Sequence, residues 1–275
     1  MSAADSGRPH VICCMKVVPR PEEVSVDPAT RTVDRAHARS VINPPDMNLL
    51  EMALELKDRH GGQVSLLSMG PPFFDEYLRI GLAMGADRAY LLSDRAFGGA
   101  DTLATSYTLA QGIRRIAADQ GYDLVLCGEE SSDGATAHVP PGIAEWLGVP
   151  QVTYASDIAL DDGHARASRH VKGGHEVLLL PLPAVVSVCV GVNEPRFIDF
   201  ERKVWAETEA SLTVWTAADL EVDADMIGLM GSPTTVSGLG EARAVERRRE
   251  LLSGTPEEEA RALFERIQAI LHRGA

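Results

Sequence analysis

The chain has 275 residues, of which 45% are hydrophobic and 24% are charged, and its formal net charge at pH 7 is −14. So acidic a surface repels nucleic acid, whose binding depends largely on cationic side chains that neutralise phosphates, and we expect no nucleic-acid partner. The longest apolar runs contain prolines and are too short to span a bilayer, so we expect no membrane span.

The N-terminal stretch lacks the basic and apolar regions of an export signal, so we expect a cytoplasmic protein. Its four cysteines lie inside apolar, strand-like runs, which is typical of reduced thiols packed in a core. The eight histidines are scattered, without the spacing of metal ligands. We therefore predict no metal site.

Strand-like and helix-like patterns alternate through the first half of the chain. In chain order, we predict strands at 11–18, 63–68, 89–92 and 123–127, an exposed hairpin at 24–33, and helices at 47–59, 73–84 and 101–118. Strands separated by helices of this length are parallel and joined by right-handed crossovers. The pattern predicts an α/β fold with a doubly wound, mostly parallel sheet.

The second half of the chain has a different pattern of predicted secondary structure. Four successive strands are predicted at 152–160, 166–170, 175–180 and 184–190, which form a β-rich extension. Residues 206–254 have weak periodicity and read as a C-terminal arm. Thr255 and Pro256 then begin a final helix, with Glu258 completing a capping box. Its apolar stripe needs a surface to cover, on this domain or on another subunit.

The stretch that follows the predicted strand at 123–127 is rich in small, hydroxylated and acidic residues. Together with the loops after Met15, Met69 and Leu92, it should lie at the carboxyl edge of the sheet, where doubly wound folds bind ligands. Its backbone N–H groups lead into a helix and suit a phosphate, although a simple capped turn explains the same residues. The chain contains neither a G-x-G-x-x-G turn after a strand nor a P-loop.

Several segments in a fixed order resemble the beta subunit of electron transfer flavoprotein. The matching segments are Cys14–Val17, Asn43–Pro44, Leu82–Arg88, Gly128 with Asp133, Gly134 and Thr136, Leu182–Val186, and Asn193–Arg196. The resemblance covers roughly residues 10–220 and implies an adenine nucleotide alpha hydrolase-like or flavodoxin-like topology. It also implies a heterodimer with an alpha subunit that carries FAD.

In this family the beta subunit binds AMP in ordinary members and a second FAD in electron-bifurcating members. By resemblance, the cofactor-binding residues are Cys14, Asn43, Pro44, Pro45, Asp46, Met69, Gly128, Glu129, Glu130, Ser131, Ser132, Asp133, Gly134, Ala135, Thr136, Ala137, His138 and Val139. No side chain is expected to act as a catalytic acid or base, because the cofactor carries the electrons.

The stretch 91–106 looks like the bifurcating members. Gly98 and Gly99 allow close backbone approach to a ligand. Asp101 and Thr102 are suited to cap a helix beside it and are also expected to bind the cofactor, although a glycine loop that only turns the chain remains the alternative. We expect FAD rather than AMP in this subunit. Whether NADH is the donor stays open, and catalysis is expected only within a bifurcating complex.

Residues 191–205, here called the recognition segment, resemble the loop that anchors electron transfer flavoproteins to acyl-CoA dehydrogenases or related flavoproteins. The expected contact residues are Asn193, Glu194, Pro195, Arg196 and Phe200. Many members have a leucine and a proline where this chain has Phe200 and Glu201, so the particular dehydrogenase stays open. Packing of the segment's aromatic residues on their own domain is the alternative.

The predicted organisation has two parts. Residues 1–205 form a nucleotide-binding α/β domain that includes the recognition segment, and residues 206–275 form an arm and helix that pack on the alpha subunit. The expected function is electron transfer between a dehydrogenase and a downstream acceptor. A regulatory protein that binds adenine nucleotides without a redox role is the alternative, and it predicts a self-sufficient homodimer.

Overall fold

A computed structural model describes residues 8–20, 25–26, 33–34, 39–235, 249 and 251–272. The chain divides into two compact units, Met1–Leu239 and Gly240–Ala275, and each is considered by itself. Among the described helices, none combines the length and apolarity needed to cross a membrane.

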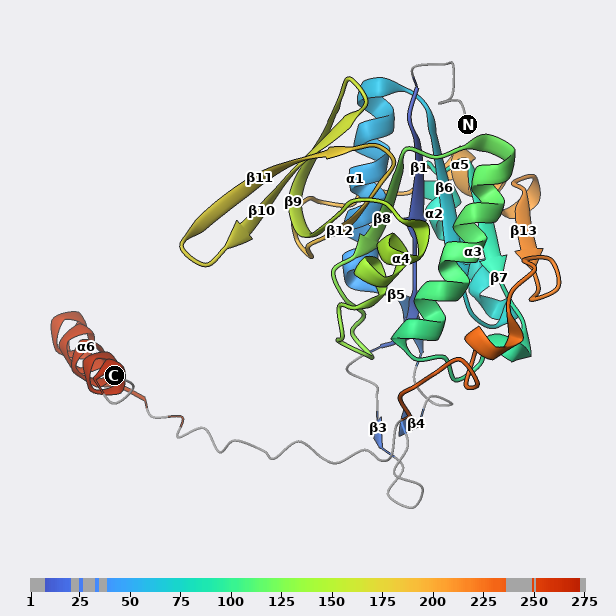
Figure 1. The fold of residues 1–275 in the computed structure, drawn as a ribbon. Helices are drawn as coiled ribbons and strands as arrows, with labels where there is room; N and C mark the ends of the chain where they lie inside the picture. The colour runs from blue at the N-terminus through green and yellow to red at the C-terminus, as the bar shows by residue number, and fades with distance from the viewer. Residues whose placement is uncertain are drawn as a thin grey trace. The chain divides into compact units, whose positions relative to one another are not determined.

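The first unit is built on a nine-stranded sheet (Figure 1). Its strands are β1 (His10–Cys14), β6 (Gln63–Met69), β7 (Arg88–Leu92), β8 (Leu124–Gly128), β9 (Gln151–Asp161), β10 (His164–Val171), β11 (Gly174–Pro181), β12 (Ala184–Val188) and β13 (Leu212–Trp215). The order is β11-β10-β9-β12-β8-β1-β6-β7-β13. Strands β9 to β11 pair antiparallel, and the other neighbours pair parallel.

In the parallel part of the sheet, the direction in which the chain adds successive strands reverses at β1. The chain runs from β1 outward to β6 and β7, then returns to β8 on the other side of β1 and continues to β12. This 3-2-1-4-5 order confirms the doubly wound fold and differs from the 2-1-3-4-5 order of flavodoxin-like sheets. The topological switch point, where such folds bind ligands, lies between the ends of β1 and β8.

Helices cover both faces of the sheet (Figure 1). The helices α1 (Pro44–His60), α2 (Asp75–Met84) and α5 (Phe200–Thr208) pack on one face, and α3 (Thr102–Gln120) and α4 (Val139–Leu147) pack on the other. Alternate residues of β1 divide between the two cores, with Val11 and Cys13 on the α1 side and Ile12 and Cys14 on the α3 side. This division is the expected result of a strand buried on both faces.

Two short ladders precede α1. Strand β2 (Val17–Pro19) pairs with β5 (Ser40–Ile42), and β3 (Ser25–Val26) pairs with β4 (Val33–Asp34), both antiparallel. The β3–β4 pair agrees with the predicted hairpin, although the rest of that hairpin lies outside the described residues. The predicted first strand is in fact divided into β1 and β2. Helix α1 begins at Pro44, three residues earlier than predicted, because a proline fits the first helical turn.

Short 3₁₀ turns occupy three connections at the carboxyl edge and in the arm. They are η2 (Pro72–Phe74), η3 (Arg95–Phe97) and η4 (Ala224–Met226). The predicted helix at 73–84 therefore begins as a 3₁₀ turn and becomes α-helical at Asp75. Asp94 caps η3 by accepting a hydrogen bond from the N–H of Ala96.

The structure places helix α5 and strand β13 where the sequence predicted irregular chain. Asp199 caps α5 by accepting from the N–H of Arg202, and only Ala206 of this helix is fully buried. The apolar residues Phe200 and Val204 are exposed, so the helix lacks the inward apolar stripe by which helices are recognised in a sequence. Strand β13 pairs with β7, so part of the predicted arm belongs to the main sheet.

In the second unit, helix α6 (Pro256–Leu271) follows Thr255, and the predicted capping box with Glu258 is formed. Five large apolar side chains of α6 are exposed, namely Leu263, Phe264, Ile267, Ile270 and Leu271. Residues 236–248 and 250 of the predicted arm lie outside the described residues.

Candidate functional site: the carboxyl edge at β1 and β8

The carboxyl ends of β1 and β8 lie next to each other, with Cys14 opposite Cys127 in the parallel register. Gly128 ends β8 against the first turn of α1. A Cβ atom added at Gly128 would lie 2.2 Å from Oδ1 of Asp46 and 3.0 Å from Cβ of Pro45. A side chain at position 128 is therefore excluded by space, and the site brings together residues predicted from distant parts of the sequence.

Asn43 and Asp46 tie the β1 end to the loop that follows β8. The amide of Asn43 donates to Oδ1 of Asp46 and to the carbonyl oxygen of Glu130, both at 2.9 Å, and its oxygen accepts from the N–H of Ser132 at 3.1 Å. The other oxygen of Asp46 accepts from the N–H of Lys16 at 2.6 Å. Both side chains are buried. These two buried side chains therefore fix the loop that follows β8 relative to the sheet.

Lys16 adds a positive charge on the outer side of the same loop. Its ammonium group lies 2.6 Å from Oδ1 of Asp133 and donates to Oγ of Ser131 at 3.1 Å. Lys16 belongs to one of the segments that resemble the family, but it is not among the predicted site residues. Its position directly after β1 was the available signal, because chain that follows a parallel strand lies at the ligand-binding edge.

The backbone of the β8–α4 loop, residues 129–138, has an unusual conformation. Ala135 and Ala137 have φ angles of 46° and 57°, in the left-handed region that costs an L-residue about 1–2 kcal/mol. His138 returns to the right-handed region with φ −88° and ψ −19°. A left-handed residue followed by a right-handed one turns successive N–H groups toward one side and forms an anion-binding concavity.

The donors of this concavity come from the loop rather than from the helix. Pro140 and Pro141 occupy the first turn of α4 and have no N–H group. The N–H groups of Thr136, Ala137 and His138 have no acceptor among the described residues. Because the partial positive charge of the helix N-terminus remains, the loop suits a phosphate. The donor set thus fits the phosphate of a nucleotide.

The loop after β7 is occupied in part by its own chain. The carboxylate of Asp101 caps α3 through the N–H groups of Leu103 and Ala104, and its second oxygen accepts from Oγ1 of Thr234 at 2.6 Å. A Cβ at Gly99 would lie 3.4 Å from Cβ of Leu229. Asp101 therefore caps a helix as predicted, and residues 228–234 lie against the loop that contains Gly98 and Gly99, here called the glycine loop.

Cys14 and Met69 end their strands at this edge, beside the loops just described. The pKa of the Cys127 thiol is raised mainly by a hydrogen bond to Cys14 and, to a smaller extent, by burial. Burial also raises the pKa of the Cys13 thiol. These two thiols remain protonated at neutral pH and are not poised as nucleophiles. No group of three or more histidine, cysteine or acidic side chains in the described ranges is arranged to hold a metal ion.

Burial raises the pKa of Asp46 from 3.8 to about 7, although hydrogen bonds from Asn43 and from the backbone of Lys16 act in the opposite direction. The unfolded chain loses this proton near its ordinary pKa, whereas the folded chain keeps it to about pH 7. The resulting stabilisation is complete below the unfolded pKa and is lost as the pH rises through the folded pKa. We expect a loss on the order of 4 kcal/mol across this range.

Urea unfolding of the wild type and of Asp46→Asn from pH 4 to pH 8 measures this loss. Burial lowers the pKa of His10, so this residue contributes with the opposite sign in the same range, and the difference between the two proteins isolates Asp46. The stability of the wild type relative to Asp46→Asn is expected to fall as the pH rises. Parallel pH profiles would contradict the assignment.

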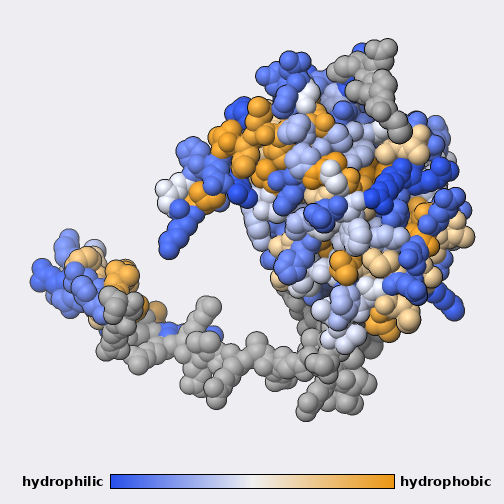
Figure 2. All heavy atoms as spheres, in the orientation of Figure 1, coloured by the Kyte–Doolittle hydropathy of each residue, from blue (hydrophilic) through white to orange (hydrophobic). Residues whose placement is uncertain are grey.

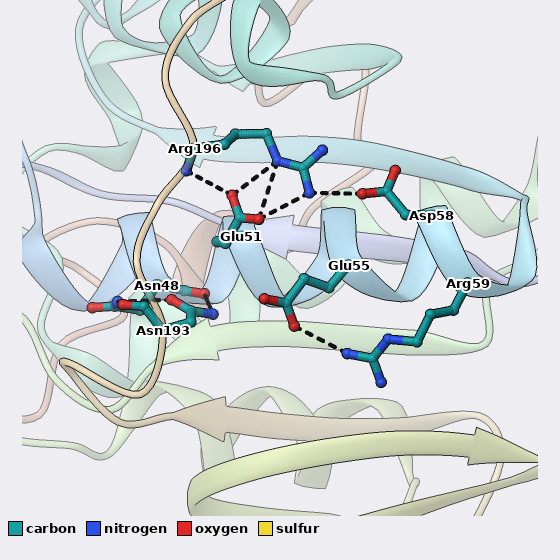
Figure 3. Close-up of polar contacts among 7 residues, drawn as sticks. All are labelled: Asn48, Glu51, Glu55, Asp58, Arg59, Asn193 and Arg196. Carbon is teal, nitrogen blue, oxygen red and sulfur yellow. Dashed lines mark hydrogen bonds and ion pairs between the residues drawn. The ribbon is translucent and has the colours of Figure 1, made fainter.

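The recognition segment lies along α1 (Figure 3). The guanidinium and the backbone N–H of Arg196 both bond to Glu51, and the guanidinium also reaches Asp58 at 2.8 Å. Asn193 exchanges hydrogen bonds with Asn48. Two of the predicted contact residues, Asn193 and Arg196, thus have inward-facing partners on the chain's own helix.

The outer side of the recognition segment carries exposed aromatic residues. Phe197 is 98% exposed and Phe200 is 77% exposed. Glu194 and Pro195 lie between the two residues that are held on α1. The role of Asn48 and Glu51 as partners of the recognition segment was not predicted from the sequence. The available signal was that polar residues lie beside the predicted apolar stripe of this helix.

A doubly wound sheet with an anion-binding loop at its switch point is typical of nucleotide-binding α/β proteins. The model of the electron transfer flavoprotein domain matches residues 30–220, and the chain belongs to this family. Its relatives include beta subunits of electron transfer flavoprotein. They do not favour the alternative of a regulatory protein that binds adenine nucleotides without a redox role.

Three relatives illustrate the relationship. The beta subunit of electron transfer flavoprotein from Clostridium acetobutylicum is 44% identical over 227 residues, which is 82% of this chain and 86% of the relative. The caffeyl-CoA reductase-Etf complex subunit CarD from Acetobacterium woodii is 44% identical over 228 residues, with the same coverage of both chains. Protein FixA from Azotobacter vinelandii is 40% identical over 247 residues, 88% of each chain.

Proposed function

We propose that the chain is the beta subunit of a heterodimeric electron transfer flavoprotein. In this role it passes electrons between a flavoprotein dehydrogenase of the acyl-CoA dehydrogenase type and a downstream acceptor. The observation that carries the proposal is the β8–α4 loop, whose N–H groups form an anion-binding concavity at the switch point of a sheet in this family. The chain's net charge of −14 fits a protein partner better than a polyanion.

We propose FAD rather than AMP as the nucleotide at this loop. The N–H groups near Thr136 to His138 would hold a phosphate, with Lys16 supplying positive charge nearby. The resemblance of residues 91–106 to bifurcating members supports FAD. When bound, the flavin would supply the electron-transfer chemistry, and the protein would set its position and surroundings.

We further propose flavin-based electron bifurcation, which the resemblance of residues 91–106 to bifurcating members supports. Within it, the chain's residues bind and orient the cofactor and perform no acid–base step of their own. Asn43 and Asp46 hold the β8–α4 loop from its buried side. Gly128 has no side chain and so leaves the space that the carboxylate of Asp46 occupies. The recognition segment is the proposed contact with the dehydrogenase.

We also propose that α6 packs on the alpha subunit, since the five large apolar side chains of its stripe are exposed. Deleting residues 254–275 is expected to weaken heterodimer formation at least tenfold, because the apolar face that would be buried is removed. Co-expression with the alpha subunit followed by size-exclusion chromatography measures assembly for the full-length and shortened chains.

The same chromatography tests the proposed function. The full-length chain is expected to elute as a heterodimer with the alpha subunit and with bound flavin. A stable homodimer that carries nucleotide and ignores the alpha subunit would contradict the proposed function. Undiminished assembly of the shortened chain would contradict only the role given to α6.

A further inference from the structure

Glu51 is a buried carboxylate in the middle of α1, with only 5% of the residue exposed. One of its oxygens accepts from the backbone N–H of Arg196 at 2.9 Å, and both oxygens contact the guanidinium at 2.8–3.1 Å (Figure 3). A buried carboxylate requires such partners, because an unpaired charge in the interior is costly. The pairing fixes both the main chain and the side chain of Arg196.

Asn48 lies one helical turn before Glu51 and holds the start of the same segment. Its amide donates to the backbone oxygen and to the side-chain oxygen of Asn193, both at 2.8 Å. Its own side-chain oxygen accepts from the N–H of Gly191 at 3.0 Å. Gly191, Asn193 and Arg196 are therefore held at their backbones by two side chains of one helix.

We propose that Asn48 and Glu51 are positioning residues that hold the recognition segment in its docking conformation and thereby present Phe197 to an apolar pocket of the flavoprotein dehydrogenase. This inference rests on the proposed function. Phe197 directly follows the fixed Arg196 and is 98% exposed, so no described part of the chain covers this ring. Exposed aromatic residues that enter a partner's pocket commonly supply much of the binding energy.

The physical advantage of this arrangement is preorganisation. A segment that is ordered only on binding pays the entropy of ordering at that moment, and a segment that is already fixed avoids this cost. The three backbone contacts precede Phe197 and hold the main chain from which its side chain projects. Loss of Glu51 should therefore weaken docking while the electron-transfer step within the docked complex proceeds at its normal rate.

The test compares Glu51→Gln with Glu55→Gln in the heterodimer with the alpha subunit. Glu55 lies one turn further along α1, and its pair with Arg59 at 3.0 Å is exposed, so the control removes the same charge without touching the recognition segment (Figure 3). Hydrogen exchange followed by mass spectrometry reports the order of residues 191–198. Steady-state reduction by a butyryl-CoA dehydrogenase with butyryl-CoA reports docking through KM and turnover through kcat.

Glu51→Gln is expected to accelerate exchange in residues 191–198 and to raise KM for the heterodimer at least tenfold, with kcat and bound nucleotide unchanged. Glu55→Gln is expected to match the wild type in all of these measurements. Faster exchange with an unchanged KM would overturn the positioning role, and so would unchanged exchange. A wild-type heterodimer that accepts no electrons from the dehydrogenase would instead contradict the proposed function.

Discussion

Replacing Gly128 with alanine is expected to empty the nucleotide site and to lower the free energy of unfolding by about 1–3 kcal/mol, the usual range for overpacking. The added Cβ would lie 2.2 Å from Oδ1 of Asp46, and the flanking Cβ of Pro45 at 3.0 Å blocks the simplest displacement. Because Asp46 is bonded to Asn43 and to the backbone of Lys16, its movement disturbs both attachments of the loop.

Nucleotide content after gel filtration and urea unfolding measure the two effects of Gly128→Ala. Gly174→Ala is the matched control, because Gly174 lies in β11 and a Cβ added there meets nothing within 4 Å. The control is expected to retain its nucleotide and its stability. If Gly128→Ala also retained both, the packing of Asp46 against β8 would not be essential to the site.

Asn43→Ala is expected to lower the free energy of unfolding by about 2–4 kcal/mol, because it leaves buried hydrogen-bonding groups without partners. The variant removes the donor to Asp46, the donor to the carbonyl oxygen of Glu130 and the acceptor for the N–H of Ser132. The β8–α4 loop would then lose its connection to the start of α1. Nucleotide affinity is expected to fall together with stability.

Ser132→Ala is the matched control for Asn43→Ala, since the bond from residue 132 comes from its backbone N–H and survives the change. Surface substitutions of this kind usually alter stability by no more than about 0.5 kcal/mol. Equal stability of the two variants would show that the side chain of Asn43 does not hold the loop.

Much of the fold could be predicted from the sequence because its strands and helices have strong hydrophobic patterns. The buried runs of β1 and β8 and the capping box of α6 are signals within short windows. Strand β8 and helix α6 formed close to where they were predicted, and β1 covers the first part of the predicted first strand. Strand β13 has only four residues, and its place beside β7 depends on contacts between distant segments. Helix α5 was not predicted, because its apolar residues Phe200 and Val204 are exposed and form no inward stripe.

The candidate site was predictable to a similar degree. The position of the β8–α4 loop follows from the rule that ligands bind at the carboxyl edge of a parallel sheet. The left-handed conformations of Ala135 and Ala137 were not predictable, since alanine rarely adopts them and no residue type announces them. The partners of Arg196 were equally hidden, because Glu51 is separated from it by 145 residues.

The relation between the glycine loop and the C-terminal segment also emerged only in three dimensions. From the sequence, Gly98, Gly99 and Asp101 of the loop at residues 94–101 were predicted to lie beside a ligand. Asp94 accepts from the N–H of Ala217, and Asp101 accepts from Thr234, so two points of this loop are bound by residues of the predicted arm. Any flavin ring placed beside this loop would therefore lie close to residues 228–234 as well.

The most direct test of the account is the identity of the nucleotides released by acid denaturation of the purified heterodimer. The protein must be kept in flavin throughout purification, so that a weakly held FAD is not lost. The account predicts about two FAD per heterodimer and little AMP, one of them from the loop between β8 and α4. One FAD together with one AMP would contradict the assignment of a second flavin and would make the protein a single-flavin carrier.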